Sequence, residues 1–208
     1  MVEKTYNEIK TIKEYALVNK GPIMVDDSID FIISKIHQKR ARKVLEIGTA
    51  IGYSAIMMAL SSPNLTITSI EKDKDRYLEA VKNIKKFNLE DRITLIYNDA
   101  LEVSLKEKYD LILIDAAKSK NLDFFNKFEK NLEPNGTIIT DNLSFHGYVE
   151  QEPSQIKNRN IRALVRKIRN YIDFLENNLK YKTTFYEIGD GLSVTEKRMW
   201  YNMKLLVI

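Results

Sequence analysis

The sequence predicts an α/β fold in which a mostly parallel sheet of seven strands carries helices on both faces and ends in an antiparallel hairpin. Short apolar runs alternate with longer segments of helical periodicity, and continuous apolar strands separated by helices are typical of a parallel sheet covered on both sides. Near the C-terminus, the turn Gly189-Asp190-Gly191 separates two alternating segments, which predicts the hairpin.

The expected elements follow one another without an obvious linker. The breaker Gly21-Pro22 divides two amphipathic helices, which are expected at 3–18 and 26–38. Buried strands are expected at 44–47, 65–70, 93–97, 111–114 and 137–140. Helices are expected at 53–60, 73–87 and 122–132, with a short turn near 100–105. A long helix from after Ile156 to about Leu179 and strands at 182–188 and 192–195 complete the order.

Length and composition predict one soluble domain over 1–208, with a helical cap at 1–38, a core at 39–197 and an extension at 198–208. The absence of cysteine excludes a disulfide scaffold, thiolate metal sites and a cysteine nucleophile. The charged N-terminus lacks the apolar core of a secretory signal, so a cytoplasmic location is expected. A net charge of +4 permits an anionic partner such as RNA, although general solubility explains it equally well.

A glycine loop follows the first predicted strand. The spacing from Gly48 to Gly52, after the acidic Glu46, is G-x-x-x-G and differs from the G-x-G-x-x-G of dinucleotide enzymes. Glu71 ends the second strand, where a carboxylate can accept hydrogen bonds from ribose hydroxyls, and Asp99 ends the third, placed to meet an adenine edge. A structural turn with surface acids is the alternative, but the loop and two acids together favour a nucleoside-containing cofactor.

Oxygen-bearing side chains end the next two strands. Asp115 follows the fourth strand, and Asp141 and Asn142 follow the fifth. Hard oxygen donors suit Mg²⁺, Mn²⁺ or Ca²⁺, whereas either aspartate alone would more often cap a helix. Lys118 comes three residues after Asp115, and a lysine near a cation can lose proton affinity and act as a general base. A solvated surface lysine is the equally weighted alternative.

These motifs resemble the metal-dependent O-methyltransferase family that includes catechol and caffeoyl-coenzyme A O-methyltransferases. The segment from Glu46 to Ser54, the Asp115-Ala116-Ala117-Lys118 run and the Asp141-Asn142 pair carry the resemblance, together with Pro22-Ile23-Met24. It implies a Rossmann-like class I methyltransferase fold, S-adenosylmethionine as cofactor, a divalent metal such as Mg²⁺ and a homodimer. The implied cofactor contacts are Met24, Glu46, Gly48, Thr49, Gly52, Ser54, Glu71, Asp99, Ala100 and Asp115; the implied metal ligands are Asp115, Asp141 and Asn142, and the catalytic residues Lys118 and Asp115.

The motifs are compatible with two classes of substrate. The motifs are most similar to small bacterial members, a branch that includes a tRNA 5-hydroxyuridine methyltransferase, so tRNA is an expected partner and a small phenol or catechol the alternative. Four arginines share one face of the predicted long helix: Arg159, Arg162, Arg166 and Arg169. Such a row can hold RNA phosphates, or it can be a solvated helix surface. A dehydrogenase-like binding module is disfavoured by the glycine spacing. The tail 199–208 extends past the family's usual end.

Overall fold

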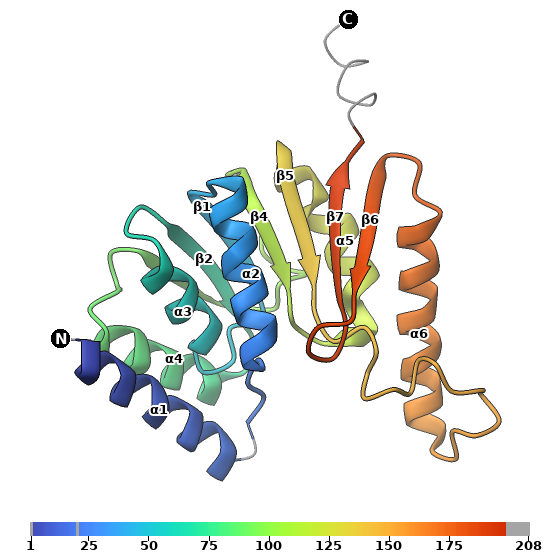
Figure 1. Cartoon of the computed structure of the whole chain (residues 1–208), viewed down its shortest axis with the longest axis horizontal. Coiled ribbons are helices and arrows are strands. Elements are labelled where there is room, and N and C mark those ends of the chain that lie inside the picture. The colour runs from blue at the N-terminus through green and yellow to red at the C-terminus, as the bar shows by residue number, and fades with distance from the viewer. Residues whose placement is uncertain (1, 20, 199–208) are drawn as a thin grey trace, which may run out of the picture. The chain divides into compact units, whose positions relative to one another are not determined.

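The structure, a computed structural model, describes residues 2–19 and 21–198, with side chains from residue 8 onward. The chain forms two compact units, residues 1–104 and 105–208, and Figure 1 labels their helices and strands. Apart from Arg198, the predicted extension 198–208 lies outside the described residues. No helix within the described ranges is long and apolar enough to cross a membrane.

The first unit pairs three parallel strands with four helices. Its elements are α1 Val2–Val18, α2 Asp26–Lys39, β1 Lys43–Ile47, α3 Tyr53–Ser61, β2 Thr66–Glu71, α4 Lys74–Lys86 and β3 Ile93–Tyr97. The strands pair in the order β3-β2-β1. Ile47 lies opposite Ile70 and Glu71 lies opposite Tyr97, so the three strands end at one edge, where ligands of open α/β sheets bind.

The local sequence explains the helices of this unit. In α2, Ile29, Ile32 and Ile36 are buried, and their spacing of three and four residues places them on one helical face. The helix ends at Lys39, and the next residue, Arg40, adopts a left-handed conformation with φ 51°. In α4, the Asp73 side chain caps the helix start by accepting a hydrogen bond from the backbone N–H of Arg76 at 3.0 Å. The predicted boundaries of α2, α3 and α4 are confirmed to within one or two residues.

The second unit contains four strands and the long helix. Its elements are β4 Tyr109–Ile114, η1 Lys118–Lys120, α5 Asn121–Phe128, η2 Glu129–Asn131, β5 Leu132–Thr140, α6 Arg159–Glu176, β6 Tyr181–Tyr186 and β7 Leu192–Lys197. β4 and β5 are parallel, whereas β7 is antiparallel to both β5 and β6. The predicted C-terminal hairpin is therefore confirmed, and the described residues contain seven strands.

Aromatic side chains join the helices of this unit to its strands. Phe125 of α5 meets Tyr181 of β6 edge-on, with ring centroids 5.3 Å apart, and Phe174 of α6 at 5.2 Å. The hydroxyl of Tyr171 hydrogen-bonds that of Thr140 at 2.8 Å, which satisfies both groups inside the core. Edge-to-face ring contacts and this hydrogen bond together pack α6 onto α5 and the strands.

One predicted helix is wrong in its extent. The helix expected at 122–132 ends at Phe128, and Leu132 already belongs to β5. The side chain of Asn131 explains the break, because it donates to the carbonyls of Leu105 at 3.0 Å and Glu107 at 2.8 Å. These bonds tie the chain to the segment before β4, and Leu132 pairs with Tyr109. The apolar spacing typical of a helix continues beyond Phe128, but from Leu132 onward the chain pairs with the sheet.

Candidate active site

The glycine loop has a backbone that few residues adopt. Gly48, Ala50 and Gly52 have φ values of 102°, 48° and 86°, all in the left-handed region that favours glycine. A Cβ atom on Gly52 would lie 3.3 Å from the Ala80 Cβ, so the loop packs closely on α4. The Asn83 side chain, also on α4, donates to the Ile51 carbonyl at 2.9 Å. Gly52 therefore permits close packing at the start of α3.

Glu46 lies beneath this loop with no exposed surface. Its carboxylate accepts a hydrogen bond from the Ser54 hydroxyl at 2.5 Å and a second from the Ser69 hydroxyl. Ser69 also bonds the Thr49 hydroxyl at 2.5 Å. Burial raises the pKa of Glu46 to about 7, although both serine hydroxyls oppose the rise. The network joins β1, β2 and the first turn of α3, while direct contact of Glu46 with a cofactor stays a prediction.

Glu71 also supports the loop, but through backbone donors. It is 7% exposed and accepts hydrogen bonds from the N–H groups of Ala50 at 2.8 Å, Lys72 at 2.9 Å and Asp73 at 2.8 Å. A carboxylate offers about four acceptor positions, so capacity remains for a ribose hydroxyl. These three hydrogen bonds therefore fix the orientation of the Glu71 carboxylate before any ligand binds.

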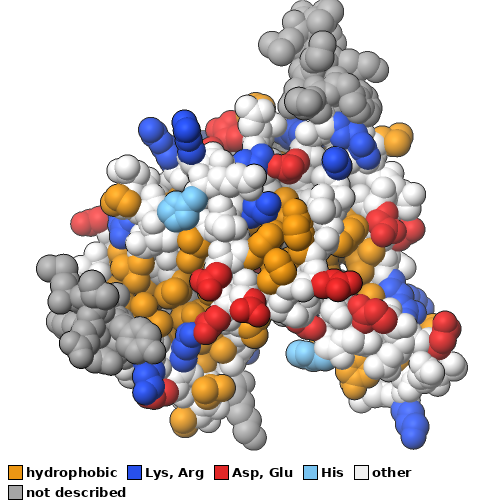
Figure 2. All heavy atoms as spheres, viewed as in Figure 1, with side chains coloured by type: hydrophobic (Ala, Val, Ile, Leu, Met, Phe, Trp, Pro, Cys, Tyr) orange, Lys and Arg blue, Asp and Glu red, His pale blue; other side chains and the backbone are white. Residues whose placement is uncertain are grey.

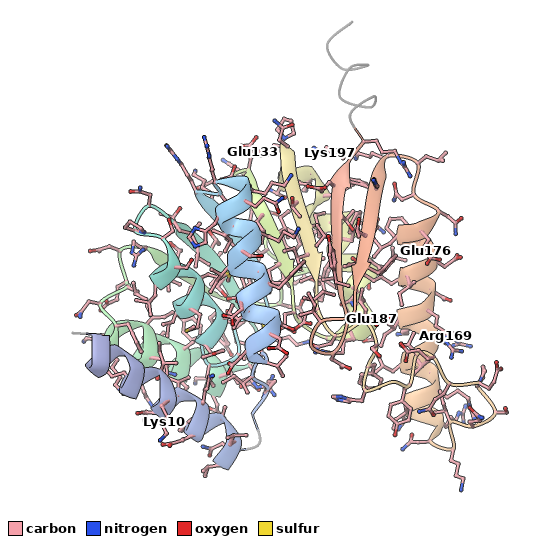
Figure 3. All side chains as sticks on the ribbon, in the orientation of Figure 1. Lys10, Glu133, Arg169, Glu176, Glu187 and Lys197 are labelled. Carbon is pink, nitrogen blue, oxygen red and sulfur yellow. The ribbon has the colours of Figure 1, made fainter. Side chains whose placement is uncertain are left out.

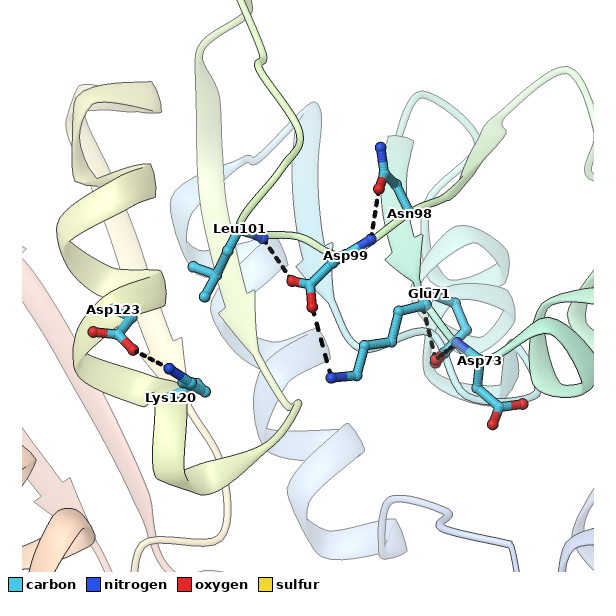
Figure 4. Close-up of polar contacts among 8 residues, drawn as sticks. Glu71, Asp73, Asn98, Asp99, Leu101, Lys120 and Asp123 are labelled. Atoms are coloured by element: carbon cyan, nitrogen blue, oxygen red, sulfur yellow. Dashed lines mark hydrogen bonds and ion pairs between the residues drawn. The ribbon is translucent and has the colours of Figure 1, made fainter.

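Asp99 and Ala100 follow β3 in a tight turn (Figure 4). The Asp99 carboxylate accepts the Leu101 N–H at 2.9 Å and lies 3.7 Å from the Lys72 ammonium. Its side chain keeps 43% exposure, whereas Ala100 is buried. The structural role of Asp99 in the turn leaves one carboxylate oxygen directed toward Lys72, and its predicted contact with adenine stays a prediction.

Met24 lies buried in the short segment between α1 and α2. The next element begins with Asp26, whose carboxylate bonds the Lys13 ammonium at 2.5 Å and the Tyr53 hydroxyl at 3.0 Å. The Lys13 hydrogen bond is the main cause of a lowered pKa for Asp26. Tyr53 is the first residue of α3, so this contact ties the segment that carries Met24 to the end of the glycine loop. These contacts of Asp26 are not predicted above, and the acidic first turn of α2 is the sequence signal that indicates them.

In the second unit, the predicted aspartates end neighbouring strands. Ile114 pairs with Thr140 in the parallel register of β4 and β5, so Asp115 and Asp141 follow at matched positions. The Asp141 N–H donates to the Ile114 carbonyl at 3.1 Å, and its carboxylate accepts the Asn142 N–H at 2.7 Å. Asp141 is 3% exposed and Asp115 is half-buried. The two aspartates therefore follow strands that are neighbours in the sheet.

These residues fit a hard divalent cation by their chemistry. Within the described ranges no group of three or more His, Cys, Asp or Glu residues forms a metal cluster. A cation would therefore depend on the two carboxylates and on the Asn142 amide, an all-oxygen set that Mg²⁺ accepts when water fills the remaining positions. Asn142 adopts a left-handed backbone with φ 62°, which asparagine tolerates better than most residues. Lys118 stands half-buried at the start of η1.

The loop after Asn142 holds two further strained residues that the sequence did not reveal. Phe145 and His146 have φ values of 49° and 56°. The Asp190 carboxylate holds them by accepting the His146 N–H at 2.6 Å, and the Asp190 carbonyl accepts the Ser144 N–H at 2.8 Å. From the sequence, the Gly189-Asp190-Gly191 turn predicts only a hairpin. In the structure, the Asp190 side chain also positions the loop that follows Asp141 and Asn142.

Two of the four predicted α6 arginines also hold this loop. Arg169, labelled in Figure 3, donates to the carbonyl of Val149 at 2.9 Å and also to that of Gln151. Arg162 donates to the Ile156 carbonyl at 3.0 Å. Arg159 and Arg166 are exposed. On the face drawn in Figure 2, acidic and basic side chains are mixed, so this face alone does not define a basic field.

A parallel sheet with an antiparallel hairpin, a G-x-x-x-G loop and acids at successive strand ends define a class I, Rossmann-like methyltransferase. The profile of the O-methyltransferase family matches residues 4–198, so the chain belongs to this family. A candidate caffeoyl-CoA O-methyltransferase of Staphylococcus aureus has 34% identity and a TM-score of 0.87, over 91% of this chain and 92% of that one. The predicted fold is thereby confirmed.

Curated relatives give the same assignment. A caffeoyl-CoA O-methyltransferase of Populus kitakamiensis is 25% identical over 90% of this chain and 83% of its own length. A flavonoid 3',5'-methyltransferase of Vitis vinifera is 28% identical over 89% and 81%. An O-methyltransferase of Bacillus cereus, solved in complex with S-adenosylhomocysteine, has the same fold with a TM-score of 0.79 at 24% identity, over 92% of this chain and 91% of that one. The protein is an S-adenosylmethionine-dependent O-methyltransferase.

Proposed function

We propose that this O-methyltransferase uses a divalent metal and methylates the 5-hydroxyl of 5-hydroxyuridine in tRNA, giving 5-methoxyuridine. The observation that carries the metal part is the matched position of Asp115 and Asp141 at neighbouring strand ends. With Asn142 they would hold Mg²⁺, which when bound lowers the pKa of a substrate hydroxyl and fixes its direction. A 5-hydroxyl beside the O4 carbonyl offers two adjacent oxygens to such a cation.

The chain's own residues would supply the rest. The glycine loop, with Glu71 beside it, would hold the methyl donor, and Lys118 would take the proton from the attacking hydroxyl. Methyl transfer is a direct displacement in which the new O–C bond forms as the S–C bond breaks, leaving S-adenosylhomocysteine. Proximity and alignment of the two reactants supply much of the rate.

The exposed arginines of α6 support an RNA substrate. Arg159 and Arg166 are exposed on the side of α6 opposite its buried residues Val165, Ile168 and Leu175. An arginine row on one helical face can pair with phosphates at successive positions. Resemblance to the small bacterial members of the family supports the same substrate.

A small phenolic acceptor is the second candidate. The curated relatives named above are a caffeoyl-CoA and a flavonoid methyltransferase, and catechol offers the same pair of adjacent oxygens as 5-hydroxyuracil. A metal held by Asp115 and Asp141 therefore suits both substrates equally.

The test uses the purified full chain with S-adenosylmethionine, Mg²⁺ and either tRNA that contains 5-hydroxyuridine or a panel of catechols. We expect 5-methoxyuridine by nucleoside mass spectrometry, and no product after metal removal with EDTA until Mg²⁺ is restored. A deletion strain should accumulate 5-hydroxyuridine. Methylation of catechols with untouched tRNA, and unchanged tRNA nucleosides in the strain, would reject the tRNA substrate.

Arg166→Glu tests the arginine row. Loss of one phosphate contact should weaken tRNA binding and lower the slope of log affinity against log salt by about one. Methylation of the free 5-hydroxyuridine nucleoside should be unchanged, because the nucleoside has no phosphates. Lys86→Glu, at an exposed residue of α4, makes the same change of charge outside α6 and serves as the matched control.

A further inference from the structure

The hydrogen bonds under the glycine loop have a fixed direction when Glu46 is ionised. The Ser54 and Ser69 hydroxyls both donate to the Glu46 carboxylate. Because the one hydroxyl hydrogen of Ser69 is used in this bond, the bond at 2.5 Å between Ser69 and Thr49 must be donated by Thr49. Ser54 then has only lone pairs left for a ligand.

The start of α3 favours an anion at the same place. Its first i→i−4 hydrogen bond runs from the Ile56 N–H to the Gly52 carbonyl at 3.0 Å, so the N–H groups of Tyr53, Ser54 and Ala55 precede the helical ladder. The helix has no side-chain cap and no acidic residue in its first turn. These groups carry the positive end of the helix dipole. The methionine part of S-adenosylmethionine carries a carboxylate, an ammonium and a sulfonium group, and of these three only the carboxylate is an anion that fits this end.

These two features conflict when Glu46 is ionised. A bound carboxylate near the α3 start would meet a Ser54 hydroxyl that presents lone pairs, with the negative charge of Glu46 directly behind it. Glu71 is the charged group whose field already acts on Glu46, and it has the same sign. If Glu46 takes up a proton, its O–H donates to Ser54, and the Ser54 hydroxyl can turn and donate to the cofactor.

We propose that Glu46 is a positioning residue that takes up one proton from solvent when the cofactor binds, so that Ser54 reverses from a donor to Glu46 into a donor to the cofactor carboxylate. No covalent bond changes, and the proton stays on the Glu46 carboxyl while the cofactor is bound. The complete burial of Glu46 makes the neutral form accessible, since desolvation brings its pKa to about 7. The inference rests on cofactor binding and is independent of the methyl acceptor.

The test is calorimetric titration of the full chain with S-adenosylhomocysteine, which measures binding without catalysis. Titration in buffers of different ionisation enthalpy gives the number of protons taken up. We expect uptake near zero at pH 6 and close to about one per site at pH 8, with affinity falling about tenfold between these pH values. Glu46→Gln, whose amide donates to Ser54 permanently, should abolish the difference in uptake and keep high affinity at pH 8.

Two serine variants separate this role from a structural one. Ser54→Ala removes the relay, so it should lower the affinity and lose the proton uptake. Ser69→Ala changes the other oxygen of the same carboxylate and should retain the uptake, with its midpoint at higher pH. Titration of the ligand amine is common to all variants and cancels in the comparison. Equal proton uptake by the wild type and Glu46→Gln, or full uptake in Ser54→Ala, would overturn the proposal.

Discussion

Two loops follow parallel strands in this protein, and they reach left-handed backbone conformations by different means. The loop after β1 uses Gly48 and Gly52 at two of its three left-handed positions, where glycine pays little steric penalty. The loop after β5 uses Asn142, Phe145 and His146 in addition to Gly147. Left-handed non-glycine residues are strained and persist where surrounding bonds hold them.

The two loops are also held in place by different kinds of contact. Buried side chains from neighbouring elements hold the first loop: Ser69 on β2, and Ala80 and Asn83 on α4. The second loop is held mainly by the turn of the C-terminal hairpin, with the Leu143 N–H bonded to the Gly191 carbonyl at 2.9 Å. The comparison indicates that the loop after β1 is shaped to hold the same ligand in every reaction, whereas the loop after β5 presents side chains beside Asp141.

Removing an acid of the second loop should have the largest effect. Asp141→Ala deletes a proposed metal ligand, and we expect kcat/KM to fall about a thousandfold, about 4 kcal/mol, while affinity for S-adenosylhomocysteine stays nearly unchanged. Asp123→Ala, an exposed carboxylate paired with Lys120 at 3.0 Å, is the control (Figure 4). Activity within a few fold of wild type would contradict a metal site here.

Changing the acid under the first loop should act on stability. The folded pKa of Glu46, raised by burial from 4.5 to about 7, means that its stabilising contribution is complete below pH 4.5 and is lost as the pH rises through 7. Between pH 4.5 and 7 the wild type should therefore lose about 3 kcal/mol of unfolding free energy that Glu46→Gln keeps. Urea unfolding of both proteins across this range measures the loss, and parallel curves would show that Glu46 keeps its ordinary pKa.

A pair of glycine variants compares the two loops directly. Gly52→Ala combines φ 86° with a Cβ atom 3.4 Å from the Ala80 Cα, and should lower the free energy of unfolding by about 2 kcal/mol. Gly147→Ala has φ 75° but its nearest neighbour, a Glu150 oxygen, is 4.0 Å away, so about 1 kcal/mol is expected. If the two variants lose equal stability, close packing on α4 contributes nothing.

The smallest effect should come from the hairpin turn. Asp190→Ala removes the acceptor of the His146 N–H and should lower the free energy of unfolding by about 1 kcal/mol. Limited proteolysis should become faster between 142 and 150, with S-adenosylhomocysteine affinity unchanged. Glu187→Ala, an exposed residue on the approach to the same turn (Figure 3), is the control. An unchanged cleavage rate would mean that Asp190 does not stabilise the loop after β5.

The sequence predicted what depends on periodicity and strand ends. The strands, the hairpin and the neighbouring positions of Asp115 and Asp141 follow from apolar runs and from the parallel sheet rule. It did not predict the end of α5, because Asn131 bonds carbonyls 24 and 26 residues away. It also did not predict that Glu46 is wholly buried or that Arg169 bonds a loop. Those properties depend on contacts between residues distant in the chain, which composition and spacing do not encode.

The way Arg169 meets its loop bears on how this enzyme family can diversify. Its guanidinium bonds main-chain oxygens of Val149 and Gln151, groups that every amino acid possesses. Substitutions at either position therefore leave the anchor in place. The side chains at these two positions can change while the chain keeps its path, so a new acceptor could be accommodated there without rebuilding the scaffold.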